Sequence, residues 1–410
     1  MAAIILIPIV VDYTALPMGW ELPKLYFWQM FGIFFSLAAG GWLILRKKTT
    51  KTNGVRIAPL FTPIALILLI SVSSVTSVYL RDLTPSHSPL YKLFNFEYGN
   101  LAIFGNPFRD FGLISVIILI SLGVAVRNLV TKRTIKYLEV AFIASSVLQS
   151  LIAIYQFLGL VNSPVLVRQG LYVGGTFGQP NFLTGHILVG FVLVSKWVTQ
   201  FSGWKRAFLV TIAVLMIAAI VSSFSIWSYF VAGLAIILIT LYEYLGVKKF
   251  VRTLYIGAAV IGVLAVPFVF VLLKIAPVYA HRINIWSEIL RIYTGDPTKL
   301  IFGSGFDTLQ EVLRGSSIFR HSYVDRAHNF ALDVFASTGL TGIFGVILLV
   351  KRVSRNFRHS LKSREFAYML IALLVWVARS LVHTSSVVNL ADMVVLVAVL
   401  FSLSNFNKHP

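Results

Sequence analysis

A histidine and an asparagine open a strongly apolar segment near residue 330, where their side chains could act on a substrate. His328 and Asn329 begin the apolar run 329–350, with Arg326 just before them and Asp333 one turn later. Because the ordinary pKa of histidine lies near neutrality, an imidazole can take a proton from a hydroxyl and later release it. Polar groups at the mouth of an apolar segment are functional candidates. We therefore predict that His328 is a general base, with a structural or solvated histidine as the alternative.

Two arginines, Arg168 and Arg282, are candidates for binding phosphate. A guanidinium group presents paired N–H donors that match two phosphate oxygens. The alternatives are ordinary interfacial arginines whose stems lie along apolar surface, or, for Arg282, an ion pair with Glu288 or Asp325. The residue types and spacing leave both readings open.

A glycine-rich turn at 174–181 precedes the apolar run 182–199 and predicts the start of a helix. Pro180 suits the first helical turn because its missing N–H would be unpaired there anyway. The N–H groups exposed at such a helix start attract anions, phosphate included. We therefore expect Gln179 and Asn181 to contact a substrate, the alternative being a simple cap and turn. Arg379, His383 and Asp392 are further polar residues near the ends of apolar runs.

The composition of the chain is that of a polytopic membrane protein. Of its 410 residues 58% are hydrophobic and only 12% are charged, and the mean hydropathy is +0.85. A soluble domain carries about 25% charged residues. The absence of cysteine excludes disulfides and thiolate-bound metals.

Eleven apolar runs are long enough to cross a membrane, since a helix needs about 20 residues to span the hydrocarbon core. A twelfth span would form if the short run 2–11 continued to residue 16. We therefore predict an all-α integral membrane protein of about 12 transmembrane helices. The eleven runs are 25–46, 57–80, 111–127, 137–160, 182–199, 207–222, 225–246, 253–273, 329–350, 366–383 and 387–405.

Lysine and arginine gather in five short loops, at 46–56, 127–136, 196–206, 248–252 and 351–364. With these spans all five loops fall on one side, which the positive-inside rule assigns to the cytoplasm. The net charge of +20 is therefore a signal of topology, and we expect no nucleic-acid partner.

The opposite side of the predicted bundle carries a long loop, which divides the chain into three parts. These are an N-terminal transmembrane bundle (1–273), an extracytoplasmic loop (274–327) and C-terminal transmembrane helices (328–410). A loop of this length usually has structure or a function of its own. Apolar stripes at 283–290 and 306–313 predict two short amphipathic helices lying against the bundle, separated by a turn at 303–305.

Three motifs together resemble the O-antigen ligase and O-antigen polymerase superfamily of membrane glycosyltransferases. His328-Asn329, nine residues, Gly339, two residues and Gly342 match its H-N-x9-G-x-x-G pattern. The segment 175–182 is similar to its "GTFGNPN" turn. Arg282-x-x-x-Trp286 followed by Phe302-Gly-Ser-Gly305 is similar to its "R-x-x-x-W … GxG" loop, and the order of motifs and spans covers nearly the whole chain.

The resemblance implies a metal-independent enzyme of the GT-C type in the cytoplasmic (inner) membrane, with an extracytoplasmic active site and no cofactor. Such enzymes move a glycan from a polyprenyl-pyrophosphate donor to an acceptor, which is a glycan, a glycolipid or a protein. Carried over, His328 would activate the acceptor, Arg282 would bind the leaving pyrophosphate, and Trp286 and Asn329 would contact the substrates. Ligase and polymerase share this chemistry and differ only in acceptor.

One departure affects the donor site. The family usually has an arginine in a "T-x-S-R" stretch, where this chain has Ser223-Phe-Ser-Ile226. Either Arg168 supplies that charge from the neighbouring loop, or the donor is bound differently. Two other classes stay open. They are a multi-span transporter or flippase, whose path intramembrane polar groups would mark, and a structural or regulatory membrane protein with degenerate motifs.

Overall fold

The computed structural model describes residues 112–160, 173–275, 277–319, 324, 326–354, 360–383 and 387–406. Within these ranges all regular structure is helical. The helices are α6 (Leu113–Leu129), α7 (Lys132–Phe157), the 3-10 turn η2 (Gly175–Phe177), α9 (Pro180–Gln200), α10 (Gly203–Ser222), α11 (Ile226–Ile275), α12 (Pro277–Thr294), α13 (Pro297–Phe302), α14 (Leu309–Arg314), α15 (Phe330–Ser354), α17 (Arg364–Ser380) and α18 (Val387–Phe406).

The helices occupy the predicted apolar runs. The predicted runs from 111–127 onward all fall on these helices. The predicted runs 225–246 and 253–273 share one helix, α11, and lie on either side of a break at Gly246. Five helices are long and apolar enough to cross a membrane by length and composition, which indicates a membrane protein. The predicted runs 25–46 and 57–80, and the possible twelfth span, lie outside the described residues. The five candidate spans are Arg133–Phe157, Pro180–Gln200, Gly203–Ser222, Ile226–Val247 and Phe330–Lys351.

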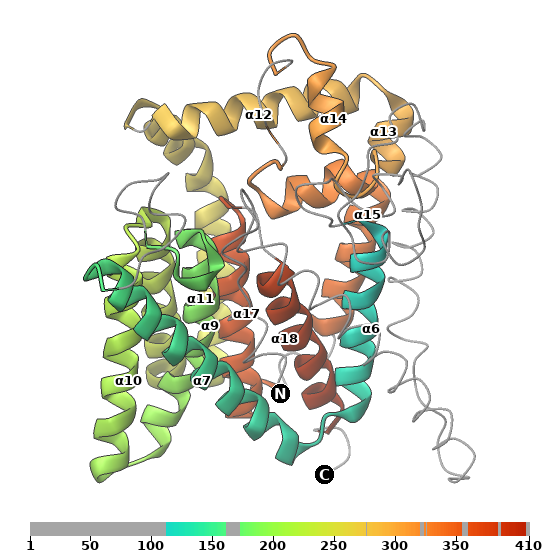
Figure 1. The fold of residues 1–410 in the computed structure, drawn as a ribbon. Coiled ribbons are helices and arrows are strands. Elements are labelled where there is room, and N and C mark those ends of the chain that lie inside the picture. The colour runs from blue at the N-terminus through green and yellow to red at the C-terminus, as the bar shows by residue number, and fades with distance from the viewer. Residues whose placement is uncertain are drawn as a thin grey trace, which may run out of the picture.

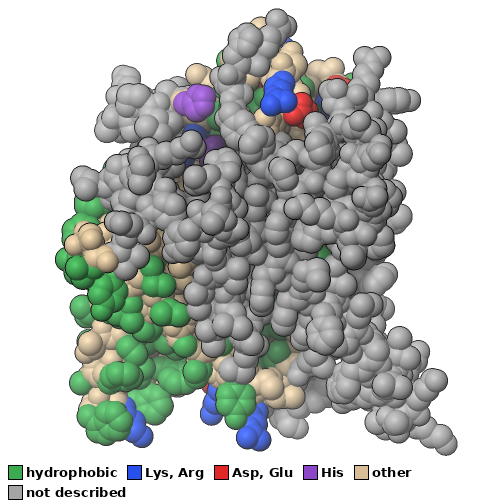
Figure 2. Space-filling view, in the orientation of Figure 1, with side chains coloured by type: hydrophobic (Ala, Val, Ile, Leu, Met, Phe, Trp, Pro, Cys, Tyr) green, Lys and Arg blue, Asp and Glu red, His purple; other side chains and the backbone are tan. Residues whose placement is uncertain are grey.

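The described helices run up and down in a bundle, with α12 lying across one end of it (Figure 1). The starts of α9, α15 and α18 point toward that end, and their C-terminal ends point away from it. On the face seen in Figure 2, several lysine and arginine side chains gather at the end opposite α12. The predicted basic loop 196–206, between α9 and α10, lies at this end (Figure 1).

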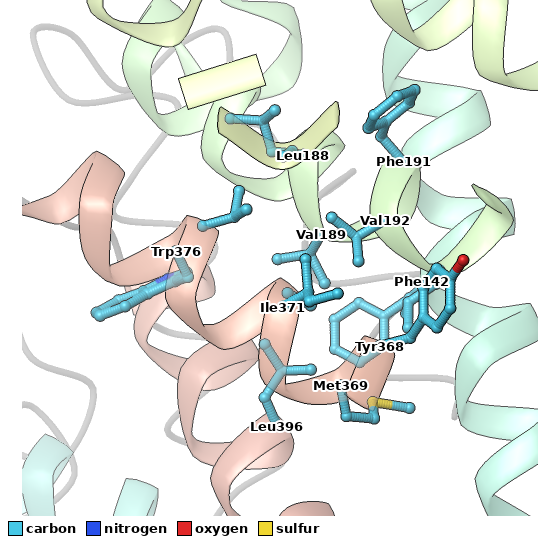
Figure 3. Close-up of a cluster of buried hydrophobic side chains, with 14 of the residues drawn as sticks. Phe142, Leu188, Val189, Phe191, Val192, Tyr368, Met369, Ile371, Trp376 and Leu396 are labelled. Atoms are coloured by element: carbon cyan, nitrogen blue, oxygen red, sulfur yellow. The ribbon is translucent and has the colours of Figure 1, made fainter. Parts of the chain in front are cut away.

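Helix α9 is the centre of the bundle. In the most apolar part of α9 78% of residues are buried, against 22% in α10 and 28% in the first part of α11. A helix that is apolar all round is stable only when other helices surround it. Its leucine and valine side chains pack against Phe142 of α7, Ile371 and Trp376 of α17 and Leu396 of α18 (Figure 3).

A buried ion pair joins α7 and α9 near the end of the bundle opposite α12. Lys196 Nζ donates to both carboxylate oxygens of Glu139, at 2.5 and 2.6 Å, and the indole N–H of Trp197 donates to Oε2 of the same carboxylate at 2.8 Å. Both charged side chains are almost fully buried. Because each donor and acceptor is satisfied, the pair can lie inside the bundle.

A second, smaller core lies under α12. It is formed by apolar side chains of α12, α14 and α15, among them Ile289, Tyr293 and Phe335. The predicted amphipathic helices are therefore confirmed at α12 and α14, but two details differ. The turn 303–305 is preceded by a helix that was not predicted, α13, which Asp296 caps, and Phe306 precedes α14 instead of belonging to it.

Candidate active site

Asn329 is the cap of α15. Its side-chain Oδ1 accepts a hydrogen bond from the N–H of Leu332 at 3.1 Å, and its carbonyl accepts one from the N–H of Asp333 at 2.8 Å. An asparagine at this position satisfies N–H groups that the first helical turn leaves without an intrahelical acceptor. The Asn329 side chain, which was predicted to bind substrate or to orient the imidazole of His328, therefore fixes the start of α15, the helix that follows His328.

The backbone at His328 is strained and held from both sides. His328 has φ +53°, a left-handed conformation that is rare for a residue with a side chain. The preceding residue, Ala327, donates its N–H to Asp333 Oδ1 at 2.7 Å, and its carbonyl accepts the indole N–H of Trp286 at 2.7 Å. Trp286 of α12 and Asp333 of α15 thus fix the peptide groups of Ala327. Such strain persists where the surroundings determine the conformation, and it often marks functional sites.

A contact between two glycines joins α13 to α15. Helix α15 is broken at Gly339, which has φ +63°. A Cβ atom there would lie 2.4 Å from the carbonyl carbon of Ile301, and one on Gly303 would lie 2.4 Å from the backbone of Ser337. Only residues without a Cβ allow this approach of two backbones. Gly339 belongs to the predicted signature of α15 and Gly303 to the loop motif, so the two motifs meet in space.

The break in α15 also redirects hydrogen bonds. The carbonyls of Ala336 and Ser337 accept from the N–H groups of Ser304 and Gly305, at 2.9 and 3.0 Å. The hydroxyl of Ser304 adds a bond to the carbonyl of Ala336 at 3.1 Å. These bonds attach the loop after α13 to the helix that carries His328, so α12 and α15 are connected both at Trp286 and at this loop.

Arg282 of α12 reaches the segment that follows α17. Its Nη1 donates to the carbonyl of Val382 at 2.6 Å, and its Nη2 lies 3.3 Å from Nδ1 of His383. The pKa of His383 is well below its ordinary value, first because the side chain is buried and then because Arg282 and Arg379, together with His328 when it is protonated, place positive charge near it. His383 is therefore neutral and can accept the hydrogen bond from Arg282. These four side chains come from three separate stretches of chain, namely α12, the segment before α15 and the end of α17, and gather at the end of the bundle near α12.

Arg379 connects this group to the start of α9. It is fully buried, and its Nε and Nη2 donate to the carbonyl of Asn181 at 3.0 and 2.7 Å. Its guanidinium lies over the ring of Phe182, with Cζ 5.6 Å from the ring centre. Gly185 leaves room for it, since a Cβ there would lie 3.1 Å from Nε.

The turn before α9 is held by side chains of α7. Gln156 accepts from the N–H of Gly175 at 2.8 Å and donates to its carbonyl at 3.0 Å, while Gln149 accepts from the hydroxyl of Thr176 at 3.1 Å. Gly178 has φ +70°, and Gln179 is the N-cap without a capping bond from its own side chain. The predicted helix start at Pro180 is therefore confirmed.

The stretch that departs from the family pattern lies beside Asn181. The hydroxyl of Ser225 donates to Asn181 Oδ1 at 2.6 Å. Ile226 has 64% of its surface exposed and begins α11. Arg379 donates two hydrogen bonds to this turn. Arg168, predicted to supply the missing charge, and Asp325, a possible partner of Arg282 or orienting group for His328, lie outside the described residues.

A serine, a histidine and an aspartate form a hydrogen-bonded row inside the bundle. His186 Nδ1 lies 2.8 Å from Asp392 Oδ2, and Nε2 lies 2.9 Å from Ser145 Oγ. This order of groups activates serine nucleophiles in other proteins. Here all three are buried, and the imidazole packs beside the rings of Phe142 and Phe177. The row therefore serves to join α7, α9 and α18.

The structure places the predicted residues His328 and Arg282 each near His383, and Gln179 and Asn181 at the turn that Arg379 contacts. Arg379 and His383 stood out in the sequence as polar residues near the end of an apolar run, but the sequence assigned them no role. Among the described residues no cluster of three histidine, aspartate or glutamate side chains could hold a metal ion. No protein-family model matches the chain, and no curated protein matches it in sequence.

Proposed function

We propose that the chain is a membrane glycosyltransferase, resembling the O-antigen ligases, that moves a glycan from a polyprenyl-pyrophosphate donor to an acceptor outside the cytoplasm. The observation that carries the proposal is the gathering of His328, Arg282, Arg379 and His383 at one end of the helix bundle. Positively charged and proton-accepting groups held together at an end of a membrane bundle suit a substrate with a diphosphate and a hydroxyl.

In the proposed reaction His328 is the general base. The acceptor hydroxyl gives its proton to the imidazole as its oxygen forms a bond to the anomeric carbon of the donor sugar. The bond from that carbon to the diphosphate oxygen breaks, and its electron pair leaves with the diphosphate. A single displacement of this kind inverts the anomeric centre. The imidazolium then releases its proton to water.

Arg282 would offset the charge of the leaving diphosphate. Its guanidinium is oriented by Val382 and His383, so it is held before the substrate arrives. A preorganised cation stabilises developing negative charge without reorganising during the reaction. The start of α9, with Gln179 and Asn181, would add N–H groups on the side of Arg379. The proposed protein has about 12 spans in the cytoplasmic membrane, and its chemistry needs no metal.

A polymerase would use the same donor chemistry with a growing glycan as acceptor. A transporter is the alternative from another class. The buried pairs His186–Asp392 and Lys196–Glu139 are the observation that favours a transporter, because such groups line proton paths in membrane proteins. Both pairs, however, are satisfied within the bundle and join helices, as structural ion pairs do.

The test is glycan transfer by the purified protein in lipid nanodiscs, with a polyprenyl-pyrophosphate glycan as donor. His328→Asn is the informative variant, because asparagine tolerates a positive φ but cannot act as a base near neutral pH. We expect this variant to fold normally and to lose transfer by about a hundredfold or more. His281→Asn is the matched control, since the exposed His281 packs its ring against Phe319 and has no role in the proposed reaction.

Transfer by His328→Asn at the rate of the unaltered protein would remove the proposed base. No transfer by the unaltered protein, together with movement of the donor across a liposome membrane, would favour the transporter instead.

A further inference from the structure

An apolar cavity of about 280 Å³ lies between α6, α15 and α18. It is lined by aliphatic side chains of all three helices, for example Ile120, Val346 and Val397. Space of this kind inside a bundle binds an apolar ligand in preference to water.

The cavity follows α15 along most of its length. Residues on both sides of the break at Gly339 line it, from Phe330 to Leu349. Along α18 the lining runs from Leu390 to Phe401, about 16 Å at a rise of 1.5 Å per residue, which is about half the thickness of a hydrocarbon core of about 30 Å. A ligand that fills the cavity would therefore extend through about one leaflet of the membrane.

The cavity has one polar end, beside the strained loop at His328. Arg326 and Phe330, two residues before and two after His328, both line it. Arg326 pairs with the buried carboxylate of Asp307 at 2.9 Å. Asp333, which holds the N–H of Ala327, lines the same end. The polar end of a ligand in this cavity would thus lie next to the proposed general base.

We propose that this cavity binds a single long hydrocarbon chain of a lipid whose anionic headgroup lies at His328 and Arg282. The inference rests on the proposed function, under which the lipid is the donor and the chain is its isoprenoid tail. A volume of about 280 Å³ spread along α15 is narrow, so it suits one chain and not the several chains of a multiply acylated lipid. The small residues Gly123, Ser337 and Gly342 leave this room between the helices.

The proposal predicts opposite effects for two neighbouring residues of α15. Val346 lines the cavity, whereas Ile347 does not and has 55% of its surface exposed. We expect Val346→Trp to fill the cavity and weaken the binding of undecaprenyl diphosphate in nanodiscs by about tenfold or more, because the tail loses its apolar site. Ile347→Trp adds the same side chain one residue away and should bind as the unaltered protein does.

Two further probes separate the tail from the headgroup and from other lipids. Inorganic pyrophosphate should bind equally to the Val346→Trp and Ile347→Trp variants, and phosphatidylglycerol should not compete with undecaprenyl diphosphate. Loss of pyrophosphate binding by Val346→Trp, or equal competition by phosphatidylglycerol, would overturn the proposal. So would unchanged binding of undecaprenyl diphosphate by Val346→Trp.

A measurement on the unaltered protein covers the case in which Val346→Trp does not fold. A photoreactive diazirine on the isoprenoid chain should label peptides of α6, α15 and α18, and labelling confined to α10 and α11 would overturn the inference. The proposed function can fail separately. Undecaprenyl diphosphate that binds in the cavity without any glycan transfer would refute the enzyme and leave the cavity assignment standing.

Discussion

Replacing Gly339 by alanine should break the connection between α13 and α15. The residue has φ +63°, and an added Cβ would lie 2.4 Å from both the carbonyl carbon and the carbonyl oxygen of Ile301. The left-handed conformation costs a residue with a Cβ about 1–2 kcal/mol. The backbone of Ile301 cannot rotate away as a side chain would, so the loop must separate from the helix.

The expected loss follows from what that separation breaks. The two bonds from Ser304 and Gly305 to the carbonyls of α15 each contribute about 1 kcal/mol. Together with the backbone strain, the free energy of unfolding should fall by about 3–4 kcal/mol. That is a large part of the 5–15 kcal/mol by which folded proteins are ordinarily stable.

Thermal unfolding followed by tryptophan fluorescence is the suitable assay, since the chain has eight tryptophans and no cysteine for thiol dyes. The midpoint for Gly339→Ala should fall by at least about 5 °C. Gly233→Ala is the control, because Gly233 lies in α11 with no atom within 4 Å of an added Cβ. It should be unchanged or slightly more stable, as alanine favours helix. Equal midpoints for the two variants would refute the close contact between Gly303 and Gly339.

Three further predictions concern other contacts. Trp286→Phe removes the donor to the buried carbonyl of Ala327. The kcat of the proposed transfer should therefore fall more than its KM changes. An unchanged kcat would show that the indole does not position the loop at His328. Lys196→Met should lower the free energy of unfolding by about 3–5 kcal/mol, because it leaves Glu139 buried and unpaired. The double variant Lys196→Met, Glu139→Leu should regain most of this free energy. A double variant no more stable than Lys196→Met would contradict this account. Hydrogen bonds from an arginine and a serine lower the pKa of Glu288 from 4.5 to about 2, so its stabilisation should be present above pH 4.5 and lost as the pH falls toward 2. Denaturation against pH should show a smaller acid loss in Glu288→Gln than in the unaltered protein, and identical acid curves would argue against the depressed pKa.

The helices were predictable because their signals are local. The apolar run of α9 and its proline at the first turn each specify structure within a few residues. The stripe of α12 was equally legible, since Ile285 and Ile289 recur at helical spacing and both are buried.

The connections within the site were not predictable because they join distant residues. The break in α15 depends on Gly303, which lies 36 positions before Gly339, and no local pattern pairs the two. The sequence predicts that Trp286 contacts the substrates, but it gives no sign that its indole N–H donates to the carbonyl of Ala327, 41 positions later. The bond from Arg379 to Asn181 joins residues 198 positions apart, and a buried arginine has no sequence signal that names its partner.

The buried row formed by Ser145, His186 and Asp392 has a consequence for biosynthesis. His186 enters the membrane with α9, but Asp392 follows 206 residues later. Until α18 is synthesised, the imidazole and the carbonyl of Phe182, which Asn389 contacts at 3.1 Å, must be solvated in another way. The ribosome therefore has to synthesise the chain as far as α18 before the centre of the bundle can close. Chains that terminate early would expose polar groups of α9 that membrane quality-control proteases can recognise.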